Sequence, residues 1–182
     1  MSERGEWTRG GWVARPFSEL EVGDELWGAL TVTEAHVVAA AGNFNDPGPN
    51  HVNELQASAG RFGSRIAHGT LLVGVATGVL GNSLGATIVA LLEQSSRFLL
   101  PVRIGDTVIP HWTVGRTTPK QSLGGGIVDF DGEVLSAGGE RLIELTTKLA
   151  VAEKAPWRPR DQVRTHGGGT AREHNDTDRG DD

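Results

Sequence analysis

The 182-residue sequence contains no cysteine, which excludes disulfides, thiolate chemistry and cysteine-based zinc sites. It also lacks long hydrophobic runs. The longest, residues 71–80, includes glycine and threonine and is far shorter than the roughly 20 apolar residues that span a bilayer. Basic residues are outnumbered by acidic ones, and the formal net charge of −6 argues against a nucleic-acid-binding protein. The first residues hold no apolar stretch of the kind that directs secretion. We therefore expect a cytoplasmic protein that binds neither membrane nor nucleic acid.

Large apolar side chains are scarce at both ends of the chain. Residues 1–15 and 155–182 are rich in glycine and charged residues, and such segments bury too little surface to offset the entropy lost on ordering. We expect a flexible N-terminal segment and a disordered C-terminal tail. Residues 16–154 are predicted to form a single domain, because a chain of this length supports one sizeable core.

Helices are predicted in the first half of this domain. Residues 34–42 and 51–60 should form two short helices, the first with Val37, Val38 and Ala41 on one face.

A third and longer helix is predicted over residues 68–80, which are apolar almost all the way round. This pattern indicates a helix buried on every side. Gly69, Gly74 and Gly78 would weaken an isolated helix, so we expect a sheet to wrap closely around it and leave no room for side chains. Gly81 and Gly85 are expected to end the helix.

The second half of the domain is predicted to be strands, because β-branched and apolar residues alternate with polar ones there. Together with one strand near the N-terminus, the predicted strands cover residues 25–32, 86–98, 106–116, 127–136 and 141–152. A turn at residues 137–140 suits a hairpin. The layout is α+β, with a curled antiparallel sheet wrapped round a long buried central helix.

A polar loop before residues 51–60 carries the clearest chemical signal. Asp46 and His51 are spaced i, i+5 on a turn stiffened by Pro47 and Pro49, so the carboxylate and the imidazole could face one point. Such a pair can act as general acid and base. The alternative is a turn whose charged residues are simply solvated.

The start of the long helix is a second candidate site. The main-chain N–H groups at a helix N-terminus are free, and the Gly69 N–H could stabilise negative charge that develops on a carbonyl oxygen. The alternative is a tight junction that binds no ligand. For His68, just before it, we favour a structural hydrogen bond over direct catalysis, because a buried imidazole usually needs a partner.

Two blocks of sequence resemble the MaoC-like dehydratases, a family that includes the (R)-specific enoyl-CoA hydratases. The family signature D-x-N-P-[LIV]-H falls on residues 46–51, with Asp46, Pro49 and His51 in the matching places. A second block, F-G-x-x-I-A-H-G, matches residues 62–69 at every specified position. The chain is similar to this family from about residue 17 to residue 153.

The first block departs from the family pattern at three positions. Gly48 replaces the usual asparagine, Asn50 replaces an aliphatic residue, and Asn45 replaces a glycine. An alternative alignment would put Asn43 at the place of the acid and leave the site without a carboxylate. We prefer the alignment with Asp46, which keeps the family's spacing to the histidine.

The resemblance implies a hot-dog fold and a hydratase or dehydratase that interconverts 2-enoyl and 3-hydroxyacyl thioesters. It implies that Asp46 and His51 activate a water and that the Gly69 N–H holds the thioester oxygen. The further residues expected at the substrate-binding site are His68, Thr70, Asn45, Gly48 and Asn50.

The resemblance also implies an acyl-CoA or acyl-carrier thioester as substrate, with no separate cofactor and no metal. We expect a homodimer, or a hetero-oligomer with a homologous subunit. Two other functions are compatible with the same fold, since a fold alone does not determine function. They are a thioesterase and a non-catalytic subunit of a hetero-oligomeric hydratase.

Overall fold

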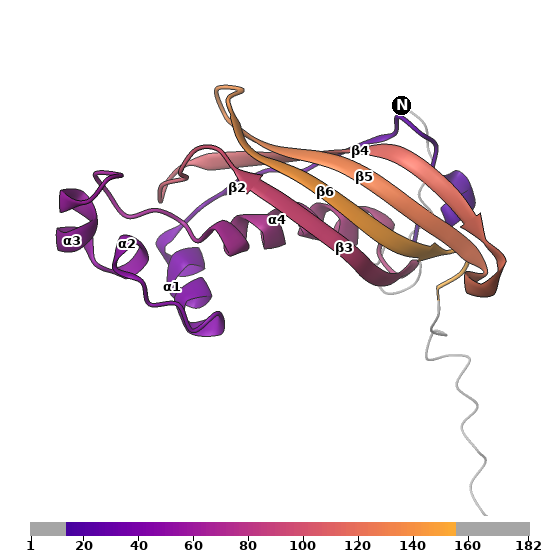
Figure 1. Cartoon of the computed structure of the whole chain (residues 1–182), viewed down its shortest axis with the longest axis horizontal. Helices are drawn as coiled ribbons and strands as arrows, with labels where there is room; N and C mark the ends of the chain where they lie inside the picture. The colour runs from indigo at the N-terminus through magenta and orange to yellow at the C-terminus, as the bar shows by residue number, and fades with distance from the viewer. Residues whose placement is uncertain (1–13, 156–182) are drawn as a thin grey trace, which may run out of the picture.

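The computed structural model describes residues 14–155, in which one antiparallel sheet packs on one long helix (Figure 1). The helices are α1 (Glu34–Asn43), α2 (Pro49–Val52), α3 (Glu54–Ala59) and α4 (Gly69–Leu84), with short 3-10 helices at Phe17–Glu19 and Gln121–Leu123. The strands are β1 (Glu25–Trp27), β2 (Leu30–Thr31), β3 (Ile88–Phe98), β4 (Thr107–Lys120), β5 (Gly125–Ser136) and β6 (Arg141–Ala152).

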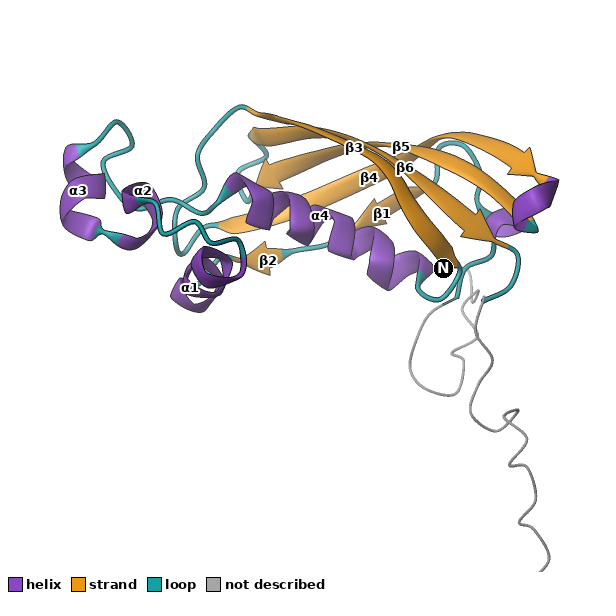
Figure 2. Cartoon of the chain, turned by 60° about the horizontal axis from the view of Figure 1, so that its bottom comes forward, coloured by secondary structure: helices purple, strands orange, loops and turns teal. Residues whose placement is uncertain are grey.

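The sheet has the order β1-β4-β5-β6-β3, with β2 also paired to β4, and every pairing is antiparallel. Helix α4 runs along one face of this curled sheet, whereas α1, α2 and α3 gather beyond one end of it (Figure 2). The predicted α+β fold, with a curled sheet on a long helix as in the hot-dog arrangement, is confirmed.

The core forms where the inward side chains of the sheet meet α4. Alternate residues of β4 and β5 point inward, as their sequence pattern predicts, and the helix contributes one apolar face. The indole Nε1–H of Trp112 donates a hydrogen bond to the main-chain oxygen of Ala76 at 2.8 Å, which joins the middle of β4 to the middle of α4. Other fully or nearly fully buried members are Val108, Val114, Val128, Phe130, Val134, Leu72, Leu80 and Leu84.

The prediction that α4 is buried on every side is wrong. Gly74 and Gly78 are exposed, and a Cβ added to either would meet nothing within 4 Å. With the exposed Thr70 and Asn82 they form a stripe at i+4 spacing, on a face of α4 that the sheet does not cover. These two glycines therefore do not make room for the sheet. Close approach to the sheet does occur at Gly69, where an added Cβ would lie 2.7 Å from the Phe98 ring of β3, and at Gly28, where it would lie 2.5 Å from a side chain of α4.

Two predicted elements are interrupted. The strand expected over residues 25–32 breaks at Gly28 and gives β1 and β2. The helical stretch expected over residues 51–60 breaks at Asn53, whose side-chain oxygen accepts a hydrogen bond from the Gln56 N–H and caps α3.

Two helix details also differ from the prediction. Helix α4 continues through Gly81 and ends at Gly85, which adopts a φ of 57° in the left-handed region that favours glycine. In α1 the buried residues are Val37 and Ala40, whereas Val38 is exposed, so the buried face is rotated from the expected one.

The predicted flexible N-terminus and disordered tail lie largely outside the described residues. Ala14 forms a bridge with Gly85, and the Arg15 N–H donates to Leu84 O. None of the helices within residues 14–155 has the length and apolar character needed to cross a membrane.

Candidate active site

Asp46 lies in the loop that joins α1 to α2. Its main-chain N–H donates to Ala41 O at 3.0 Å. The preceding Asn45 adopts a φ of 52°, a left-handed conformation that asparagine tolerates better than most residues. The Gly48 N–H donates to Asp46 Oδ1 at 3.3 Å and restrains the carboxylate. The Asp46 side chain is 55% exposed, so it faces solvent rather than the core.

His51 lies in α2 and is tied to the segment that leads into α4. Its Nδ1 is 2.8 Å from the main-chain oxygen of Ile66, and the Ile66 N–H donates to Asn50 O at 2.9 Å. Because a carbonyl oxygen only accepts hydrogen bonds, the His51 Nδ1 carries the proton. The His51 Nε2 is left with a free lone pair, as a proton acceptor requires.

Asp46, His51 and His68 meet at one point, where one ligand-type atom from each lies within 4.8 Å of the others. The two imidazole rings stack with centroids 3.7 Å apart and planes 22° apart. The structure thus brings together the carboxylate and the imidazole that, by their sequence spacing, could face one point. Asn43, which takes the place of the acid in the alternative alignment, is the last residue of α1.

Two imidazoles and one carboxylate could also ligate a transition metal. The His68 Nε2, however, is 2.9 Å from the main-chain oxygen of Asp46, so this nitrogen donates a proton and offers no lone pair. A metal at this nitrogen would have to displace that proton and break the hydrogen bond, and the other nitrogen, Nδ1, is fully buried. The arrangement therefore fits acid–base chemistry better than metal binding.

Gly69 is the first residue of α4, and its N–H has no acceptor among residues 14–155. A Cβ at this position would lie 2.7 Å from the ring of Phe98 in β3, so any other residue here would push that ring aside. A free N–H at the start of a helix, together with the helix dipole, can stabilise an oxyanion. Thr70, the next residue of α4, is exposed.

The remaining predicted site residues play different parts. Within the described residues, neither the Asn45 nor the Asn50 side chain hydrogen-bonds to Asp46 or His51. Gly48 borders both groups, because an added Cβ would lie 3.1 Å from Asp46 Oδ1 and 3.4 Å from His51 Cδ2. The absence of a side chain at Gly48 therefore leaves room at the point where the two groups meet.

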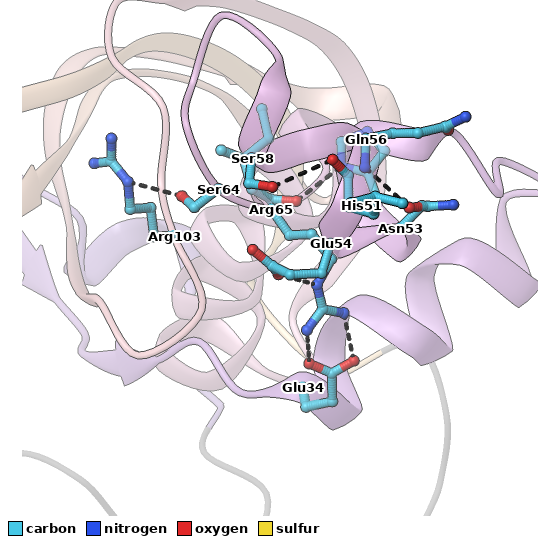
Figure 3. Close-up of polar contacts among 11 residues, drawn as sticks. Glu34, His51, Asn53, Glu54, Gln56, Ser58, Ser64, Arg65 and Arg103 are labelled. Carbon is cyan, nitrogen blue, oxygen red and sulfur yellow. Dashed lines mark hydrogen bonds and ion pairs between the residues drawn. The ribbon is translucent and has the colours of Figure 1, made fainter.

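Arg65 is a positioning residue that the sequence analysis missed. Its guanidinium donates two hydrogen bonds to Glu34 of α1, at 2.7 and 2.8 Å, and one to Glu54 of α3, at 2.9 Å (Figure 3). Arg65 also precedes Ile66, whose main-chain oxygen holds His51. One side chain thus links the elements on both sides of the Asp46 loop. Its partners lie 31 and 11 residues away, so no local pattern could identify them.

Replacement of Arg65 by methionine should lower the melting temperature at neutral pH by roughly 2–4 °C, a shift typical of a weak ion-pair network in a domain of this size. The hydrogen bond from Arg65, assisted by its charge, holds the pKa of Glu34 below the ordinary value of 4.5. Stability from a carboxylate with a lowered pKa is present above its unfolded pKa and is lost as the pH falls through the folded one. The melting temperatures of the two proteins should therefore converge below pH 4.5.

Thermal unfolding over a pH series measures this effect. Arg61→Met, which removes an exposed arginine from the same segment, is the control and should show no such convergence. If the difference in melting temperature between Arg65→Met and the wild type stayed unchanged below pH 4.5, the role assigned to Glu34 would be contradicted.

Comparison with known proteins gives a consistent set of relatives. Residues 22–124, which include both sequence blocks, match the family described as MaoC like domain. The chain is 38% identical over 107 residues to an (R)-specific enoyl-CoA hydratase of Rhodospirillum rubrum, and the match covers 59% of this chain and 74% of that protein. It is 34% identical over 128 residues to a 3-hydroxybutyryl-CoA dehydratase of Methylorubrum extorquens, with 65% and 81% covered. A solved structure of an unliganded (R)-hydratase from Pseudomonas aeruginosa aligns with a TM-score of 0.69 and 26% identity, over 76% of this chain and 86% of that one.

Proposed function

We propose that this chain, which belongs to the MaoC-like domain family, is a hydro-lyase that interconverts a 2-enoyl thioester and a 3-hydroxyacyl thioester. The observation that carries the proposal is the meeting of the Asp46 carboxylate and the His51 imidazole, with their ligand-type atoms within 4.8 Å. Both residues are hydrogen-bonded to the segment just before Gly69: the His51 ring contacts Ile66 O, and the main-chain oxygen of Asp46 accepts from His68. The relatives named above support an acyl-CoA as the substrate class.

The geometry assigns a part of the reaction to each group. The Asp46 carboxylate and the His51 Nε2 both accept hydrogen bonds from one water, because the His51 Nδ1–H is already engaged by Ile66. As the water oxygen adds to C3 of the enoyl group, one of these groups takes a proton from the water and then gives it to C2, so that H and OH add across the double bond. The negative charge that develops on the thioester oxygen is stabilised by the Gly69 N–H.

No separate cofactor is expected, because the reaction adds the elements of water across a double bond and requires no external oxidant or reductant. Proton transfer and charge stabilisation are the two tasks, and side chains and a main-chain N–H can perform both.

The test is the hydration of crotonyl-CoA and of longer 2-enoyl-CoA substrates by the purified chain, followed through the ultraviolet absorbance of the conjugated thioester. We expect the absorbance to fall without release of free CoA. Release of free CoA would instead support a thioesterase. Neither signal, from a folded chain tested alone, would support a non-catalytic subunit.

We further propose that the chain acts as a homodimer. The strand β3 is an edge strand, and its exposed apolar side chains include Leu91, Leu92 and Phe98. An unpaired apolar edge is a template for pairing with a second chain. The exposed stripe at Gly74 and Gly78 lets another helix approach the backbone of α4 closely. A second copy over these surfaces would also cover the open side of the site.

Gly78→Leu should convert the dimer to a monomer and reduce the hydratase activity with it. In the single chain a Cβ at this exposed position meets nothing within 4 Å, and leucine is a better helix former than glycine by nearly 1 kcal/mol. The substitution should therefore leave the single chain folded. Light scattering after size-exclusion chromatography measures the mass.

Gly42→Leu is the matched control for mass, since Gly42 is also an exposed helical glycine with open space at its Cβ. Retention of the dimer mass by Gly78→Leu would exclude this face of α4 from the interface. A wild-type chain that is monomeric and inactive alone would point to a hetero-oligomer.

A further inference from the structure

His68 is the most buried polar side chain near the candidate site, with 1% of its surface exposed. It directly precedes α4, and its Nε2 lies 2.9 Å from the main-chain oxygen of Asp46. The acceptor is a carbonyl, so Nε2 carries the proton. The other nitrogen, Nδ1, is buried and has no hydrogen-bond partner within residues 14–155, where a proton would be unsatisfied. The surroundings therefore select one tautomer, with Nε2–H donating to the Asp46 loop.

The ring of His68 also supports the ring of His51. A single hydrogen bond, from the His51 Nδ1–H to Ile66, leaves an imidazole free to pivot about that bond. Stacking on His68 at a centroid distance of 3.7 Å removes this freedom and fixes the plane in which the His51 Nε2 lone pair lies. The direction of that lone pair decides whether Nε2 can accept a proton from water.

We propose that His68 is a positioning residue for the hydration reaction. Its Nε2–H fixes the main chain of Asp46, and its ring face fixes the plane of His51. One buried side chain thereby fixes the positions of both groups that activate the water. His68 itself takes no proton from substrate or water, because its Nε2 is 4.0 Å from Asp46 Oδ2 and its proton is engaged by the main chain. This inference rests on the proposed hydratase function.

Two substitutions separate the two contacts. His68→Gln keeps an N–H donor at a similar reach from the main chain and loses the aromatic face. His68→Phe keeps the face and loses the donor, whereas His68→Ala loses both. We expect kcat to fall roughly 100-fold in His68→Ala, as for a catalytic group misplaced by about 1 Å. Glutamine and phenylalanine should each restore about tenfold of that loss, with KM changed less than twofold.

The competing explanation is that His68 only fills space in the core. Phenylalanine, which is apolar and of similar shape, would then be at least as good as histidine, and activity would follow the melting temperature across the series. That pattern, or a His68→Phe enzyme with wild-type kcat, would overturn the proposal.

A second measurement does not depend on activity. Imidazole nitrogen chemical shifts, obtained by NMR, report which nitrogen of His51 is protonated. We expect the Nδ1–H form of His51 in the wild type and a mixture of tautomers in His68→Ala. Unchanged His51 shifts in a folded His68→Ala chain would overturn the proposal. An inactive wild type that still shows the expected change would count against the hydratase function and not against the positioning role.

Discussion

Asp46→Asn should lower kcat for hydration of a 2-enoyl-CoA by roughly 10³-fold, within the 10²–10⁴ range that a positioned acid or base contributes. The amide has the shape of the carboxylate, and its oxygen can still accept the hydrogen bond from the Gly48 N–H. It cannot take a proton from water. The loss should therefore appear in kcat, with little change in melting temperature.

His51→Asn should cause a loss of similar size for the same reason. The asparagine amide can replace the His51 Nδ1–H as donor to Ile66 O, but nothing replaces the Nε2 lone pair. The variant thus removes the base and keeps the anchor. The double variant should be little worse than either single one, because both groups act on one water.

Steady-state kinetics with matched circular dichroism checks both variants. His36→Asn is the control, because His36 belongs to the Thr33 cap of α1 and lies outside the site. Its kcat should stay within about twofold of the wild type, as for most surface substitutions. Wild-type activity in Asp46→Asn would contradict the alignment that places the family acid at this position, and independent, additive losses would contradict a shared water.

Local patterns predicted the parts of the fold that depend on neighbouring residues. The alternation of apolar and polar residues predicted the strand that is β4, and Trp112 lies on its inward side, because successive residues of a strand face opposite sides. The spacing of Asp46 and His51 on a proline-stiffened turn allowed the two groups to face one point, as they do in the structure, because the intervening loop is short. These features need no knowledge of distant parts of the chain.

The sequence could not show contacts between distant segments or surfaces open in a single chain. The stack of His51 on His68 depends on how α2 meets the start of α4, and neither segment encodes that alone. An apolar, glycine-rich helix has the same pattern whether a sheet or a second chain covers it. This ambiguity is why Gly74 and Gly78 were predicted to face the sheet and are exposed instead.

Trp112→Ala should destabilise the protein by about 3–5 kcal/mol, the usual loss when a large aromatic side chain is removed from a core. Trp112 is 0% exposed, packs edge-on against Phe130 at 6.4 Å between ring centroids, and donates its Nε1–H to Ala76 O at 2.8 Å. The loss is a large share of the roughly 5–15 kcal/mol that stabilises a typical domain. Because Ala76 is in the middle of α4, the substitution should also loosen the helix that begins at Gly69.

Trp27 offers a control of the same residue type, because its side chain is 52% exposed and stacks on His111 at the outer side of the sheet. Trp27→Ala should cost about 1 kcal/mol or less, as is usual away from the core. Urea unfolding at equilibrium measures the free energy of unfolding of both variants.

A third variant adds an atom to the core instead of removing atoms, since a Cβ on Gly132 would overlap the Trp112 ring. Gly132→Ala should cost about 1–3 kcal/mol through overpacking, and combining it with Trp112→Phe should recover part of that loss. Equal losses in Trp112→Ala and Trp27→Ala would show that the Trp112 contact between β4 and α4 does not hold the core together.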